Sequence, residues 1–125
     1  MDIGESTYTE INERGRKMSK GQKLLNAVEH FRLIDGGMHA QAMCIFLYVA
    51  KQHPKPIAMQ TIAKAIGVSQ ASVSRNVALL SSYTRYKTRG PNLLVAEEDP
   101  MERRCKLVTL THKGKSFFKT LEDTI

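Results

Sequence analysis

One stretch of the sequence, 59–82, constrains the fold more than any other, because it predicts two short helices joined by a single tight turn. A helix over 59–66 places three apolar side chains on one side: Ile62, Ala63 and Ile66. Gly67 follows where many helices end in a left-handed residue, a conformation that glycine adopts readily. Ser69 has the hydroxyl of a good N-cap, so the second helix is predicted over 70–82.

The second predicted helix, 70–82, has two sides of different chemistry. Val73, Val77 and Leu80 form an apolar stripe at helical spacing, which is the side that packs on a core. The opposite side is small or hydrogen-bonding, with one arginine and no carboxylate: Ala71, Ser74, Arg75 and Ala78, with Ser72 at its flank. A helix-glycine-helix unit is a helix-turn-helix, and such a side suits close approach to base edges and phosphates in a major groove. A solvated helix surface is the alternative interpretation.

The distribution of charge supports an anionic partner. The formal net charge is +7, and the segment from Gly37 to Tyr83 contains no Asp or Glu. A basic surface attracts any polyanion, including nucleic acid and an anionic membrane. Charge alone therefore limits the partner to an anionic one but does not show whether it is nucleic acid or a membrane.

A hairpin is predicted after the helix pair. Residues 81–92 form a polar and basic connection that contains Arg85, Lys87 and Arg89. A strand over 93–98, a turn over 99–104 and a returning strand over 105–110 then form a wing. Arg103 and Arg104 fall at its predicted tip, where arginine can enter a narrow minor groove. A surface cluster of ion pairs is the alternative.

The remaining segments complete a fold that is mainly α with a small β-hairpin (α+β), a winged helix-turn-helix. Helices are predicted over 19–34, with Leu24, Val28 and Phe31 on one face, over 38–52, and over 112–123 after the N-cap Thr111. Residues 1–17 are predicted to be a flexible tail. The length of 125 residues suits one domain, over 18–125, with the terminal helices as dimerisation elements.

Several classes of function receive no support from the sequence. The four histidines are scattered, no phosphate-binding glycine loop is present, and Cys44 and Cys105 belong to no metal-ligand spacing, so we expect no enzyme, no cofactor and no metal. No apolar run approaches the length of a membrane span, and the polar start lacks the pattern of a secretory signal. We therefore expect a cytoplasmic protein.

Two motifs together resemble the MarR family of winged-helix transcriptional regulators. The first runs from Ile62-Ala63 through Gly67-Val68-Ser69 and Val73-Ser74 to Leu80. The second, which is more specific, is Asp99-Pro100-x-Glu102-Arg103-Arg104 followed by Val108-x-Leu110-Thr111-x-x-Gly114. The resemblance covers residues 38–121.

The resemblance implies a homodimer that binds double-stranded DNA, with one recognition helix of each subunit in successive major grooves and the wings at the flanking minor grooves. By position, the groove and backbone contacts fall to Ser69, Gln70, Ser72, Ser74 and Arg75, with Ala71 allowing close approach, and the wing contact falls to Arg103 and Arg104. Many relatives are repressors that release DNA when a small molecule or an oxidant acts. No residue of this chain is assigned to such an effector.

Three departures from the family pattern refine these expectations. The connection over 81–92 is longer than usual, and its added cations Arg85, Lys87 and Arg89 are expected to contact the DNA backbone. Ala58 stands where a Ser or Thr often caps the next helix. The sequence stops at Ile125, earlier than is common, which leaves two alternatives: the family dimer does not form, or the first helix and a shortened last helix form its interface. The alternative function is a winged-helix accessory protein of a replication, recombination or mobile-element assembly.

Overall fold

The computed structural model describes residues 17–82 and 88–125, which group into two compact units. The first unit contains the described residues 17–37 together with 119–125, and the second contains the described residues between 38 and 118. All of the predicted tail except Lys17 lies outside the described residues. No helix within the described ranges is long and apolar enough to cross a membrane.

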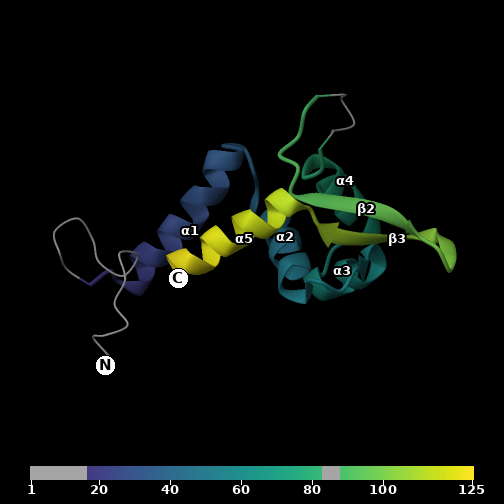
Figure 1. Ribbon diagram of the computed structural model, residues 1–125, viewed down its shortest axis with the longest axis horizontal. Coiled ribbons are helices and arrows are strands. Elements are labelled where there is room, and N and C mark those ends of the chain that lie inside the picture. Colours follow the sequence, from purple (N-terminus) through teal and green to yellow (C-terminus); the bar gives the residue numbers. More distant parts are fainter. Residues whose placement is uncertain (1–16, 83–87) are drawn as a thin grey trace. The chain divides into compact units, whose positions relative to one another are not determined.

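The second unit combines helices with a small sheet (Figure 1). In chain order its elements are α2 (Ala40–Gln52), β1 (Ile57–Ala58), α3 (Met59–Ile66), α4 (Gln70–Leu79), β2 (Leu94–Asp99), β3 (Glu102–Leu110) and the start of α5 (His112–Thr124). The central helix is α2, which contacts α3, α4 and β3. Its apolar composition explains that position, since a helix that is hydrophobic on most sides must be surrounded. The largest fully buried side chains of this core are Phe46, Ile45, Ile62, Leu80, Leu93, Leu94, Val49, Val73 and Val108.

The sheet is antiparallel with the strand order β1-β3-β2. Leu94 pairs with Leu110 and Ala96 with Val108, so one face of the hairpin packs on the helices. At the far end Asp99 pairs with Glu102, which leaves a tip of two residues. The two-residue strand β1, which pairs with Val108 and Leu107, is not predicted from the sequence.

The turn between α3 and α4 forms as the sequence predicts. Gly67 adopts a left-handed φ of 81°, and its N–H donates to the carbonyl of Ala63 at 2.9 Å. The N–H of Val68 donates to the same carbonyl at 3.0 Å. These bonds end α3 by satisfying a carbonyl that has no partner within the helix. The bounds of α3 match the prediction residue for residue.

The entry to α5 explains the Leu-Thr-x-x-Gly pattern after the wing. Thr111 caps the helix, because its hydroxyl oxygen accepts from the N–H of Gly114 at 2.9 Å and its O–H donates to the carbonyl of Asn92 at 2.6 Å. A Cβ at position 114 would collide with the carbonyl oxygen of Leu93. Glycine is therefore required where α5 crosses the start of β2.

The first unit contains α1 (Lys20–Ile34) and the last turns of α5. The hydroxyl of Ser19 caps α1 by accepting from the N–H of Gln22 at 3.1 Å. The predicted apolar face of this helix is covered only in part. Phe31 is buried together with Ala27, but Leu24 is 64% exposed and Val28 is 37% exposed.

Two boundaries near the predicted site also differ from the sequence analysis. The sequence predicts a helix over 70–82, whereas α4 ends at Leu79. Beyond it the N–H of Ser81 donates to the carbonyl of Ala78, three residues back, and the carbonyl of Leu80 accepts from the N–H groups of Leu93 and Leu94 at 2.7 and 3.1 Å. The predicted turn over 99–104 is too long. Strand β3 begins at Glu102, so Arg103 and Arg104 belong to a strand beside the tip and not to the tip itself.

The buried stripe of α4 leads to a first prediction about stability. Replacing Leu80, which is 2% exposed, by alanine should lower the free energy of unfolding by about 2–5 kcal/mol through lost burial and a residual cavity. The neighbouring Leu79 is 41% exposed, so Leu79→Ala is the matched control and should cost less than about 1 kcal/mol. Urea unfolding of the full chain measures both, and equal losses would contradict the assigned faces of α4.

Candidate nucleic-acid interface

The two sides of α4 face opposite environments. Val73 is fully buried, and Val77 and Leu80 are each 2% exposed, so the apolar stripe packs into the core as predicted. The other side carries exposed residues, namely Gln70, Ala71, Ser74 and Arg75, with Ser69 exposed at the N-cap and Ser72 half-buried. The predicted groove-facing residues on α4 are thus brought together on one accessible surface.

Hydrogen bonds organise the start of this surface. The hydroxyl oxygen of Ser69 accepts from the N–H of Ser72 at 3.1 Å, and the hydroxyls of the two serines lie 3.0 Å apart. Arg75 donates from Nη2 to the hydroxyl oxygen of Ser72 at 3.1 Å. A guanidinium carries several donors in a fixed fork, so this contact orients Arg75 while leaving further donors for a ligand.

The electrostatics of the helix pair favour an anion. Neither α3 nor α4 contains a carboxylate, while Lys64 on α3 and Arg75 on α4 are exposed cations. The N-terminus of α4 adds the positive end of a helix dipole close to Ser69. Phosphate oxygens and base edges are the ligands that such a combination of hydroxyls, cations and backbone N–H groups can bind.

The connection after α4 is anchored at its base. The carbonyl of Ser81 accepts from the N–H of Asn92 at 3.2 Å, and that of Ser82 accepts from the N–H of Gly90 at 2.9 Å. Arg89 directly precedes Gly90, so these bonds hold it near the end of α4, and its side chain is exposed. Arg85 and Lys87, which the sequence also assigns to DNA, lie outside the described residues.

The wing is formed by β2 and β3, and Figure 1 shows it extending beyond α3 and α4. The carboxylate of Asp99 accepts from the N–H of Met101 at 2.9 Å and so shapes the tip. Arg103 and Arg104 are both exposed. The side chain of Arg104 is 93% exposed and its Nε lies 3.7 Å from a carboxylate oxygen of Glu102, a loose ion pair that leaves it available to a ligand.

The charges of the wing are sorted by strand. Strand β2 carries three acids: Glu97, Glu98 and Asp99. Strand β3 carries three cations, Arg103, Arg104 and Lys106, with Glu102 as its one acid. The hairpin as a whole is therefore not basic, and only β3 offers a positive surface.

The sequence does not predict the role of one polar residue of α4, Asn76. Asn76 is 4% exposed and lies on the core side of the helix, where its Nδ2 donates to Oε1 of Gln41 on α2 at 2.8 Å. The same nitrogen donates to the carbonyl of Ser72 at 2.9 Å. The helical spacing of Val73, Asn76, Val77 and Leu80 is the signal that could have placed Asn76 on the buried stripe.

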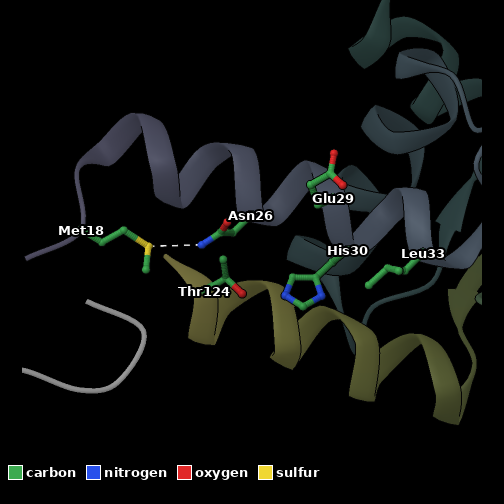
Figure 2. A pocket seen from close by; sticks show the side chains of 6 residues that line it. All are labelled: Met18, Asn26, Glu29, His30, Leu33 and Thr124. Carbon is green, nitrogen blue, oxygen red and sulfur yellow. Dashed lines mark hydrogen bonds between the residues drawn. The ribbon is translucent and has the colours of Figure 1, made fainter. Parts of the chain in front are cut away.

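A pocket of about 300 Å³ lies in the first unit, between α1 and the end of α5. Figure 2 shows its lining side chains, which are Met18, Asn26, Glu29, His30, Leu33 and Thr124. Asn26 donates from Nδ2 to the sulfur of Met18 at 3.2 Å, and Glu29 pairs with Arg32 at 2.7 Å. The pocket contains none of the residues predicted to contact DNA.

Among the described residues, no group of three or more His, Cys, Asp or Glu side chains could hold a metal ion.

Comparison with solved structures identifies the fold. The chain is similar to S. aureus MepR in a complex with DNA, with a TM-score of 0.61 and 20% identity over 82% of this chain and 75% of that one. It is similar to a MarR-family transcriptional regulator from Rhodococcus sp. RHA1, with a TM-score of 0.56 and 21% identity over 83% of this chain and 66% of that one. It also resembles the transcriptional regulator Tm0710 from Thermotoga maritima, with a TM-score of 0.59 and 20% identity over 81% and 65% of the two chains.

No family model and no curated protein matches the chain. The likeness to solved structures at this level of identity shows the fold, and the predicted winged helix-turn-helix of the α+β class is confirmed. This fold is the one found in regulators of the MarR type.

The cap of α4 leads to a second prediction. Replacing Ser69 by alanine should lower the free energy of unfolding by about 1 kcal/mol, because the N–H of Ser72 loses its acceptor. Ser74→Ala removes an exposed hydroxyl from the interior of the same helix and should change stability by no more than about 0.5 kcal/mol. Urea unfolding compares the variants, and equal effects would show that the hydroxyl of Ser69 is not the cap.

Proposed function

We propose that this protein binds double-stranded DNA sequence-specifically and regulates transcription, as a repressor. The single observation that carries the proposal is the division of α4 into a buried apolar stripe and an exposed, acid-free side with Ser69, Ser74 and Arg75. A solved structure of the same fold, S. aureus MepR, is a complex with DNA. No catalytic group is needed for this activity, and the cytoplasm is the compartment in which we expect it.

The mechanism follows from the two surfaces. We propose that α4 enters the major groove, with Arg75, Ser74 and Gln70 at base edges and Ser69, Ser72 and the helix N-terminus at a phosphate. Ala71 permits close approach of the helix backbone. Arg103 and Arg104 on β3 contact the neighbouring minor groove, and the connection with Arg85, Lys87 and Arg89 adds phosphate contacts.

We further propose that the protein acts as a homodimer through α1. Leu24, Leu25 and Val28 lie within one side of this helix and are 64%, 52% and 37% exposed. Exposed apolar side chains that gather on one helix face favour burial against a partner. We propose a second copy as the occupant, because most homo-oligomers are two-fold symmetric and a symmetric pair can bind two half-sites of a two-fold symmetric DNA motif. A small-molecule effector stays a prediction without assigned residues.

The activity is tested by selecting bound sequences from a random duplex pool and measuring affinity for a selected duplex and for a random duplex. Wild-type protein should prefer the selected duplex, and its affinity should fall steeply with salt as phosphates are neutralised. A two-fold symmetric selected motif would support the dimer. Equal affinity for both duplexes would contradict sequence-specific regulation and favour the accessory role in a replication, recombination or mobile-element assembly.

The role of Arg75 gives a third prediction. Arg75→Ala should weaken binding to the selected duplex by about 5- to 150-fold, corresponding to about 1–3 kcal/mol for a lost base contact, with a smaller loss on the random duplex. Lys87→Ala should weaken both nearly uniformly. Lys115→Ala is the control, since it removes one positive charge from an exposed position on α5, a helix that is assigned no DNA contact. Equal losses for Arg75→Ala on both duplexes would remove α4 from base recognition.

The homodimer gives a fourth prediction. Leu24→Lys should weaken self-association at least tenfold, because a charge would be buried in the proposed interface. Leu33→Lys is the matched control on the same helix, since Leu33 is 81% exposed but lies on the side of α1 opposite Leu24. Sedimentation velocity over a range of concentrations measures both variants. A Leu24→Lys protein that associates like the wild type would exclude this face of α1 as the interface.

A further inference from the structure

Asn76 is a polar residue in a place where an apolar one would be expected. It is 4% exposed and shares the core side of α4 with Val73, Val77 and Leu80. Its Oδ1 is buried with no hydrogen-bond partner among the described residues. An unsatisfied buried acceptor destabilises the folded state, whereas an apolar side chain of similar size would avoid that cost. Stability alone therefore does not explain an asparagine at this position.

The hydrogen bonds of Asn76 join α4 to α2 at a defined point. Its Nδ2 donates to Oε1 of Gln41, in the first turn of α2, at 2.8 Å. Apolar contacts are non-directional and tolerate small rotations or shifts of one helix on another. A hydrogen bond weakens steeply as its geometry changes, so this one restricts how α4 lies on α2.

The same side chain also reaches the start of the exposed surface of α4. Nδ2 of Asn76 donates to the carbonyl of Ser72 at 2.9 Å, and the hydroxyl oxygen of Ser72 accepts from Nη2 of Arg75 at 3.1 Å. A continuous set of polar contacts thus runs from Gln41 on α2 to the guanidinium of Arg75. Asn76 itself is buried and is not part of the exposed surface.

We infer that the Gln41–Asn76 hydrogen bond is a positioning contact that fixes the orientation of α4 and thereby sets the sequence specificity of DNA binding. The inference rests on the proposed function. Base-edge hydrogen bonds require the donor to be held within a fraction of an ångström, whereas contacts between cations and phosphates are less demanding. Loss of the positioning contact therefore reduces discrimination between sequences more than it reduces affinity for duplex DNA in general.

The test compares two substitutions of Gln41, which is half-buried. Gln41→Met keeps the length and shape of the side chain but removes the acceptor for Asn76. Gln41→Glu keeps an acceptor oxygen at the same reach and is the rescue control. For each full-length variant, the specificity ratio is the Kd for a random duplex divided by the Kd for the duplex selected by the wild type, both measured at one salt concentration, with urea unfolding in parallel.

Gln41→Met should lower the specificity ratio at least fivefold while the Kd for the random duplex changes less than twofold. Gln41→Glu should keep the wild-type ratio, although its added negative charge weakens binding to both duplexes by the same factor. The double variant Gln41→Leu with Asn76→Leu replaces both partners by apolar groups and should unfold at a urea concentration no lower than the wild type, but with the reduced ratio.

An unchanged specificity ratio in Gln41→Met and in the double variant would overturn the inference and assign the hydrogen bond to packing alone. A reduced ratio in Gln41→Glu equal to that of Gln41→Met would also overturn it, since the acceptor would then not be the group that matters. Failure of the proposed function is distinguishable, because in that case the wild type itself would show a specificity ratio near one.

Discussion

The burial of Val73, Val77 and Leu80 is the constraint on which the candidate interface depends. A helix that packs one stripe against a core presents the opposite side to solvent. The 3.6-residue period of the helix then determines which residues lie on that exposed side. The core that receives the stripe is built mainly by α2, which contacts both helices of the helix-turn-helix. The exposed position of Arg75 is thus a consequence of apolar packing on the far side of the same helix.

The parts of the structure that the sequence predicts well are those determined by neighbours in the chain. Gly67 and Ser69 specify the end of α3 and the start of α4, and both boundaries agree with the structure. Thr111 caps α5 for the same reason. A cap acts through one residue and the N–H or carbonyl groups within a single helical turn, so its effect can be derived from a short stretch of sequence. The buried stripe of α4 is predicted because helical spacing is also a local property.

The sequence-based predictions differ from the structure where contacts between residues far apart in the chain determine the local structure. Directly after α4 the carbonyl of Leu80 accepts from the N–H groups of Leu93 and Leu94, and no pattern within 70–82 indicates these contacts. Strand β3 begins at Glu102 because it pairs with Asp99, which moves Arg103 and Arg104 from the tip into a strand. On α1, helical spacing places Leu24, Val28 and Phe31 on one face. It cannot show that Phe31 is buried while Leu24 and Val28 stay exposed. The polar link between Asn76 and Gln41 spans 35 residues and carries no motif.

The sorting of charge in the wing limits how the two surfaces can act together. Glu97 and Glu98 on β2 would be repelled by a phosphate backbone, whereas Arg103 and Arg104 on β3 would be attracted to it. An approach to DNA with the arginines of β3 toward the duplex is favoured over one with Glu97 and Glu98 toward it, because the second orientation brings like charges together. The proposed interface therefore combines attraction on β3 with repulsion on β2, and repulsion against wrong orientations is as effective a source of specificity as attraction in the right one. With α4 fixed by its buried stripe and the wing restricted by its charges, two elements of one unit would set the register of the protein on a duplex in the proposed complex.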